Sequence, residues 1–210
     1  MAEGPEIYNL ASDLNRDIVN ANVISLELTS GPYILSIDQK YVEARENVKE
    51  LCKTLQSSTA IVKNVSADGR YLILEIQIER KKKSAFSYVA IAGFIKVVVE
   101  DGAASQNGKL PAMVLNTSAG QLNVYAGNNL RLIVAPGETI DDEIGENGYN
   151  VFTDEDGEGC AVLMEKISTD ARPLAKILID PQVIVGVGTV YRSEILYYAK
   201  LNPLTEGKQP

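Results

Sequence analysis

The sequence contains no histidine and no tryptophan, and its two cysteines, Cys52 and Cys160, lie far apart. Without histidine, a Ser/His/Asp triad, a Cys/His pair and the usual zinc-binding spacings are impossible. Two distant cysteines are most simply small apolar side chains of the interior. Any chemistry must therefore use carboxylates, amines or hydroxyls, and we expect neither a metal nor a cofactor.

Positive charge is also in short supply, because 20 Lys and Arg face 28 Asp and Glu, giving a net charge of −8. Nucleic-acid affinity comes largely from neutralising phosphates with basic side chains, so this composition disfavours DNA as a partner. No apolar run approaches the roughly 18 residues of a membrane span, and the beginning lacks a secretory signal. We expect an intracellular or intravirion protein that is neither secreted nor membrane-spanning.

Two kinds of periodicity follow each other along the chain. Apolar residues recur at helical spacing in residues 5–20 and 41–56, and Pro5 suits a first helical turn. From residue 60 the period changes to two, as in YLILEIQIE at residues 71–79. Further strand patterns occupy residues 86–100, 112–118, 120–127 and 130–135. The pattern predicts an α+β protein whose N-terminal β-sandwich is flanked by helices.

An acidic stretch separates this body from a final pair of helices. Residues 138–165 hold ten Asp and Glu and no Lys or Arg. Helical patterns follow at residues 173–180 and 189–200, joined by a glycine-containing turn and ended by Asn202 and Pro203. We therefore expect an N-terminal domain at residues 1–153, an acidic linker at 154–168 and a helical domain at 169–210.

Three segments carry a family resemblance. They are ILIDPQVIVGVGTVYRSEILYYAKLNP near the end, MAEGPEI at the start and, more weakly, GRYLILEI between them. Together they resemble the formamidopyrimidine-DNA glycosylase and endonuclease VIII family, in particular its short members from giant viruses and animals. The resemblance implies a helix-two-turn-helix unit after the β-sandwich. Because the chain stops at Pro210, we expect that unit to be partial and to have no zinc finger.

The resemblance also implies catalytic positions at the start of the chain. The family uses an N-terminal amine that attacks the sugar of a damaged nucleotide, and Ala2 occupies that position. Glu3 matches the family's catalytic carboxylate and Glu6 its companion acid. If Met1 is retained, the nitrogen of Ala2 is an amide and has no nucleophilic lone pair. Glu3 and Glu6 can also be explained as acids that favour the first turn of a helix.

DNA-binding positions are implied in the same way, and several have a purely structural alternative. Arg70 stands for a lysine on a hairpin turn, and Arg131 is the basic residue retained in an intercalating motif that otherwise reads as a core strand. Gly186 and Gly188 keep the phosphate-binding turn, in which Thr189 replaces an asparagine and can equally cap the helix. Lys176 and Arg192 would add local positive charge.

Three functions remain open. The acidic charge and the altered motifs favour a degenerate, catalytically inactive homologue reused as a structural or protein-interaction module, with a virion as one setting. Its protein partner would bind at the C-terminal helix pair, whose apolar surface is otherwise uncovered. The first alternative is a minimal DNA glycosylase and abasic-site lyase of base-excision repair that acts through the amine of Ala2. The second is a DNA-binding protein without catalysis.

Overall fold

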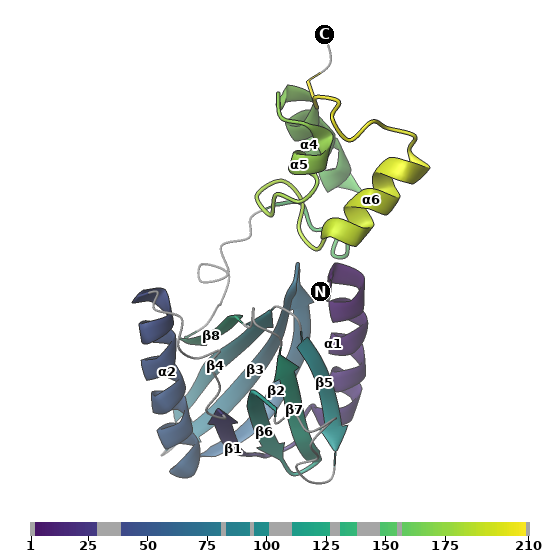
Figure 1. Ribbon diagram of the computed structural model, residues 1–210. Helices are drawn as coiled ribbons and strands as arrows, with labels where there is room; N and C mark the ends of the chain where they lie inside the picture. Colours follow the sequence, from purple (N-terminus) through teal and green to yellow (C-terminus); the bar gives the residue numbers. More distant parts are fainter. Residues whose placement is uncertain are drawn as a thin grey trace.

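The computed structural model describes residues 3–28, 39–80, 83–92, 95–100, 111–126, 131–137, 148–154 and 157–208. These residues form a larger body of strands and two helices, with a smaller helical unit placed at one end of it (Figure 1). The mixed helix-and-sheet architecture agrees with the sequence patterns. Among the described residues, no helix has the length and apolar character needed to cross a membrane.

The larger body contains two four-stranded antiparallel sheets. One has the order β2-β3-β4-β8 and consists of β2 (Thr59–Asp68), β3 (Tyr71–Arg80), β4 (Lys83–Ala92) and β8 (Arg131–Pro136). The other has the order β1-β6-β7-β5 and consists of β1 (Val23–Leu28), β6 (Met113–Thr117), β7 (Gly120–Ala126) and β5 (Ile95–Glu100). The hairpin from β2 to β3 turns at Gly69 and Arg70, with Asp68 paired to Tyr71.

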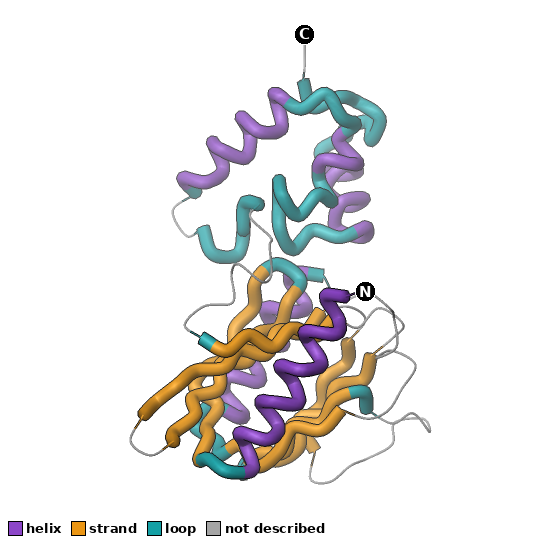
Figure 2. The backbone as a smooth tube through the Cα atoms, turned by 90° about the vertical axis from the view of Figure 1, so that its left-hand side faces the viewer, coloured by secondary structure: helices purple, strands orange, loops and turns teal. Residues whose placement is uncertain are grey.

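Both sheets and both helices of this body contribute to one hydrophobic core. In β3 the predicted alternation is confirmed, since Leu72, Leu74 and Ile76 are fully buried. Helix α1 (Gly4–Ile18) packs on β2, and helix α2 (Gln39–Gln56) packs on β1 and β8. Burial of each large aliphatic side chain contributes about 1.5–3 kcal/mol. The packed core therefore fixes α1, whose first turn is directed toward the helical unit (Figure 2).

The helical unit consists of α4 (Glu158–Thr169), α5 (Leu174–Ile177) and α6 (Thr189–Tyr198), which share a second core. Helix α4 occupies most of the segment for which we expected an acidic linker, residues 154–168. The acidic residues dominated that expectation, but Leu163 and Ile167 lie four residues apart and pack into the second core. The acidic residues at 138–147 and 155–156 lie outside the described residues.

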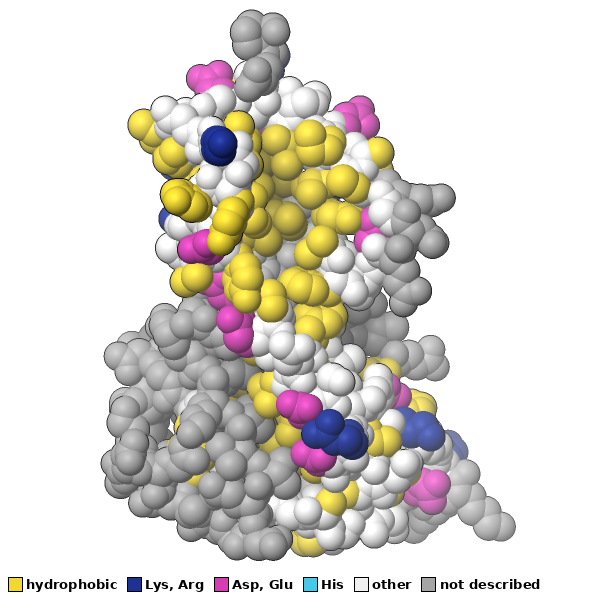
Figure 3. Space-filling view, turned by 90° about the vertical axis from the view of Figure 1, so that its right-hand side faces the viewer, with side chains coloured by type: hydrophobic (Ala, Val, Ile, Leu, Met, Phe, Trp, Pro, Cys, Tyr) yellow, Lys and Arg dark blue, Asp and Glu magenta, His cyan; other side chains and the backbone are white. Residues whose placement is uncertain are grey.

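Apolar side chains remain exposed on the helical unit, where Figure 3 shows them gathered. Val190, Tyr197 and Tyr198 on α6 are 63%, 77% and 77% exposed. The expectation that this helix pair has uncovered apolar surface is therefore correct for α6.

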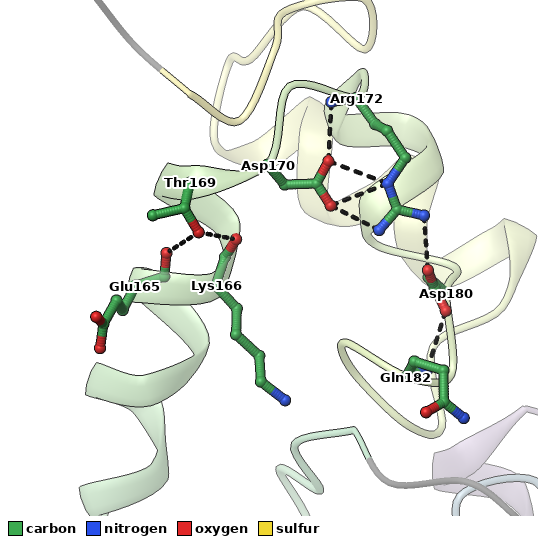
Figure 4. Close-up of polar contacts among 7 residues, drawn as sticks. All are labelled: Glu165, Lys166, Thr169, Asp170, Arg172, Asp180 and Gln182. Carbon is green, nitrogen blue, oxygen red and sulfur yellow. Dashed lines mark hydrogen bonds and ion pairs between the residues drawn. The ribbon is translucent and has the colours of Figure 1, made fainter.

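Arg172 joins two turns of the helical unit through ion pairs (Figure 4). The Arg172 guanidinium donates to Asp170 at 2.6 Å and to Asp180 at 2.7 Å. The chain returns to this place near its end, since the Lys208 amide donates to the Asp170 carbonyl at 2.8 Å. Hydrogen bonds from Arg172 hold the pKa of both carboxyls below the ordinary value of 3.8. The ion pairs thereby join the loop after α4 to the turn after α5.

Replacing Arg172 is expected to destabilise the helical unit in a pH-dependent way. Because both carboxyl pKa values are lowered by folding, their stabilisation is present above 3.8 and is lost as the pH falls through the lower folded values. The Arg172→Gln variant should therefore melt below the wild type at neutral pH, and the difference should disappear at acidic pH once both carboxyls are protonated in the folded protein. Thermal unfolding followed by circular dichroism measures both.

Arg16→Gln is the matched control, because Arg16 pairs with Asp13 and Asp17 on an exposed face of α1. Such exposed pairs contribute little. An equal melting difference for Arg172→Gln at both pH values would contradict the assigned role of the ion pairs.

Candidate active site

The carboxylate of Glu3 lies at the junction between the larger body and the helical unit. Glu3 immediately precedes the first residue of α1 and is only 2% exposed. Its Oε1 accepts a hydrogen bond from the Val190 amide and its Oε2 one from the Tyr191 amide, both at 3.0 Å. These amides belong to the first turn of α6, where backbone donors have no partner within the helix. One carboxylate thus caps a helix from the opposite end of the chain.

Glu6 connects Glu3 to Tyr191. The Glu3 amide donates to Glu6 Oε2 at 3.0 Å. The Tyr191 hydroxyl donates to Glu6 Oε1 at 3.4 Å. Burial and the nearby carboxylates of Glu6 and Glu3 raise the pKa of Tyr191, so its hydroxyl remains a donor at neutral pH. Ala2 itself lies outside the described residues.

Glycines allow the start of α1 to touch the turn before α6. The Gly4 amide donates to the Gly186 carbonyl at 2.8 Å. A Cβ on Gly188 would overlap the side chain of Glu3, and a Cβ on Gly186, whose φ is +80°, would lie 2.8 Å from the Phe152 ring. Close packing between the two parts therefore requires both glycines.

The contact uses amides that follow the glycine turn rather than those of the turn itself. Val190 and Tyr191 lie in α6, and both of their amides are occupied by the Glu3 carboxylate. Phosphate binding by the turn with Gly186 and Gly188 stays a prediction. The helix cap differs from the expectation, because Gly188 is the N-cap residue of α6 and Thr189 is its first helical residue. The side chain of Thr189 is exposed at this end of the helix.

A second polar cluster lies beside the junction and centres on Asn150. Its amide nitrogen donates to the Tyr8 hydroxyl at 2.7 Å and to Asp68 at 2.9 Å, and its oxygen accepts from the Phe152 amide at 3.1 Å. The rings of Tyr8 and Phe152 stack with centroids 4.5 Å apart. Burial is the main cause that raises the pKa of Tyr8, so this hydroxyl is also protonated at neutral pH.

The sequence did not reveal this cluster. The segment around Asn150 has the composition of an exposed loop, and residues 142 positions apart meet only in the folded chain. The neighbouring acidic residues favoured a solvated segment, and no local spacing distinguishes Asn150 from the other asparagines.

The remaining predicted positions are distributed around the junction. Arg70 is half-buried at the tip of the β2–β3 hairpin, directly after Gly69 with φ +55°. Lys176 is exposed on α5, and the Arg192 guanidinium donates to the Ala175 carbonyl at 3.5 Å. Arg131 begins β8 opposite Ala92, in agreement with the strand alternative for that stretch. Residues 127–130 before it lie outside the described residues.

The polar side chains at the junction are mainly carboxylates and hydroxyls. Within the described part of the chain, no group of three or more Cys, Asp or Glu is arranged to hold a metal ion. The arrangement can instead orient the chain start, carry protons on Glu3 or Glu6, and supply a hydrogen-bond donor from Tyr191.

Comparisons with known proteins give matches to formamidopyrimidine-DNA glycosylases. The family model described as "Formamidopyrimidine-DNA glycosylase H2TH domain" matches residues 153–209. Formamidopyrimidine-DNA glycosylase of Lactococcus lactis subsp. cremoris is 22% identical over 226 residues, covering 100% of this chain and 71% of the relative. The enzyme of Rickettsia massiliae is 42% identical over 45 residues, or 21% of this chain and 16% of the relative.

A solved structure shows the same fold. The crystal structure of the Lactococcus lactis enzyme bound non-covalently to DNA with an abasic site has a TM-score of 0.75 at 20% identity, covering 98% of this chain and 71% of that one. The resemblance to the formamidopyrimidine-DNA glycosylase and endonuclease VIII family is confirmed. The helical unit, α4 to α6, corresponds to this H2TH domain.

These comparisons correct the expected partners. Similar structures of the glycosylase are complexes with abasic-site DNA, so the expectation that DNA is disfavoured and that a protein binds the helix pair is wrong. Net charge was a poor guide because phosphate contacts depend on local side chains rather than on the total charge. The comparisons also give no support to an inactive protein or to a virion component.

Gly188→Ala is expected to loosen the junction, because its methyl group would overlap the Glu3 side chain. Overpacking of this kind costs about 1–3 kcal/mol of unfolding free energy. In a Glu3→Ala background the same change should cost less, because the overlapping atoms are gone. Urea unfolding of the two single variants and the double variant measures the coupling.

Ser193→Ala is the control on the same helix, where the exposed Ser193 hydroxyl bonds only its own helix at the Thr189 carbonyl. It should change stability by less than about 0.5 kcal/mol. Additive effects of Glu3→Ala and Gly188→Ala would be inconsistent with the contact.

Proposed function

We propose that this chain is a DNA glycosylase and abasic-site lyase of base-excision repair that acts through the primary amine of Ala2 after removal of Met1. One observation carries the proposal: the buried carboxylate of Glu3, the residue after Ala2, is held between the larger body and the H2TH domain. The named activity and abasic-site DNA complexes of the similar proteins support the same reaction class.

The chemistry requires a neutral amine and an acid beside it. At an abasic site, the Ala2 nitrogen adds to the C1′ aldehyde to give a carbinolamine, which loses water to form an imine. Removal of a proton from C2′ then expels the 3′ phosphate with the electrons of the broken C–O bond. An α-amino group has a pKa of about 7.7–8.0, so a useful neutral fraction exists near pH 7.

Glu3 and Glu6 have different parts in this proposal. Each oxygen of Glu3 uses one lone pair for an α6 amide and keeps another with which to accept or relay a proton. Glu6 accepts a hydrogen bond from the Glu3 amide at the start of α1. Tyr191 restrains Glu6 from the H2TH side. Together they would place the amine and its acid on one rigid support.

DNA would be held by basic side chains around the junction. Arg70 on the hairpin tip is the candidate for a phosphate contact from the larger body, with Arg131 as a further contact from β8. Lys176 and Arg192 are the candidates from the H2TH domain. The turn with Gly186 and Gly188, together with the exposed Thr189, would shape the surface against which the strand backbone lies. An arginine can bind a phosphate with two parallel hydrogen bonds.

The experiment is borohydride trapping on a duplex that contains one abasic site. Hydride reduces the imine to a stable secondary amine, so protein with a free Ala2 amine, verified by intact mass, should give a covalent adduct. A version with residues added before Ala2 has no such amine and should give none. Glu3→Gln should lower the trapping rate by on the order of 100-fold, because general acid–base catalysis is lost.

Glu194→Gln on the exposed face of α6 is the matched control and should trap at the wild-type rate. Arg70→Gln should raise KM and reduce the salt dependence of binding by about one phosphate contact. An adduct with the extended chain would show that another amine reacts. Salt-dependent binding without any adduct would leave DNA binding without catalysis as the function.

A further inference from the structure

Asn150 connects three separate parts of the chain with one side chain. Its two amide hydrogens reach Tyr8 on α1 and Asp68 at the end of β2, and its oxygen accepts from Phe152 at the entrance to the H2TH domain. An asparagine amide offers two donors and an acceptor, and here each kind is used. The three partners belong to the segments that carry Glu3, Arg70 and the H2TH domain.

The two short hydrogen bonds define how the hairpin lies against α1. Asp68 is two residues before Arg70 in a tight turn, and Tyr8 lies little more than one helical turn after Glu3. The Asn150 amide is therefore one polar link between the hairpin tip and the first turns of α1. A shift of the hairpin would have to break or lengthen the 2.9 Å bond to Asp68.

Aromatic packing places the H2TH entrance on the same support. Phe152 stacks on Tyr8 with centroids 4.5 Å apart, and its ring lies where a Cβ on Gly4 or Gly186 would be. Phe152, whose amide donates to the Asn150 oxygen, is thus also packed against the turn before α6. Asn150 and Phe152 together leave little freedom between the hairpin, α1 and the H2TH domain.

We propose that Asn150 is a positioning residue, which holds the hairpin tip with Arg70 at a fixed place relative to the Glu3 carboxylate. The proposal rests on the function proposed above, in which Arg70 contacts the strand backbone while the amine beside Glu3 attacks the sugar. The distance between the two contacts decides whether the abasic sugar lies within reach of the amine. A small displacement of one contact lowers the rate strongly, even when the DNA is still bound.

The test first breaks the hydrogen bond from Asn150 to Asp68 and then restores it with donor and acceptor exchanged. In Asn150→Asp, the new carboxylate faces Asp68, so the link to the hairpin is replaced by repulsion between two like charges. Its oxygen can still accept from the Phe152 amide and from the Tyr8 hydroxyl. In the double variant Asn150→Asp/Asp68→Asn, the amide and the carboxylate exchange places and can bond again, with the wild-type net charge.

The readouts are single-turnover cleavage of abasic-site DNA at saturating protein, binding of a duplex with an uncleavable tetrahydrofuran site, and thermal unfolding. Asn150→Asp should lower the single-turnover rate by on the order of 10-fold to 100-fold. The double variant should recover most of this loss, and the binding constant should change less than the rate. If Asn150 only stabilised the fold, Asn150→Asp would lower the melting temperature, whereas the single-turnover rate of the folded, saturating protein would not change.

Asn47→Asp is the matched control. Asn47 is also partly buried and donates to the Val134 carbonyl at 2.9 Å, between α2 and β8. The Asn47→Asp substitution removes a comparable hydrogen bond away from the junction. Any loss of rate that comes from reduced stability alone should therefore be equal in Asn47→Asp and Asn150→Asp.

Two failures can be told apart. If the wild type does not cleave or trap abasic-site DNA, the proposed function and the positioning role are both wrong. If the wild type is active and Asn150→Asp cleaves as fast as Asn47→Asp, only the positioning role is wrong. The positioning role is equally wrong if Asn150→Asp slows cleavage and the exchanged double variant does not recover it.

Discussion

The structure depends on one carboxylate at the end of a helix. Glu3 is buried, and burial of a charged group is unfavourable unless it is hydrogen-bonded. The two α6 amides supply charge-assisted hydrogen bonds at the positive end of that helix. The same contact joins the start of the chain to the H2TH domain. The candidate catalytic acid and the junction between the two parts are therefore one structural unit.

That contact requires glycines around it, and one asparagine supports it from the other side. For the carboxylate to reach the α6 amides, Gly4 must touch Gly186 and nothing larger than glycine can stand at Gly188. Asn150 then fixes the hairpin against α1 from the other side. The α6 amides that bond Glu3 are not available to a phosphate. In the proposed function, attraction for DNA would come from side chains around the junction rather than from these amides, and the total charge of −8 does not measure it.

Much of the architecture was predictable because it depends on local periodicity. Helix α1 and strand β3 were predicted close to their observed bounds, since their apolar residues repeat at 3.6 and 2 residues and bury one face. The family resemblance pointed to Glu3, Glu6 and the glycine turn, which the structure brings together at the junction, and their roles in chemistry and DNA binding stay predictions. Helix α4 was missed because its acidic neighbours suggested a solvated linker, whereas burial of Leu163 and Ile167 decides its structure.

The sequence by itself determined which groups are available for chemistry: without histidine, carboxylates, amines, hydroxyls and two cysteine thiols remain. It also determined the order of helices and strands, because side-chain periodicity is a local property. Only the tertiary structure decided what those groups bond. That Glu3 caps α6 and that Asn150 joins Tyr8 to Asp68 depends on contacts between residues 82 to 188 positions apart, which no local pattern encodes.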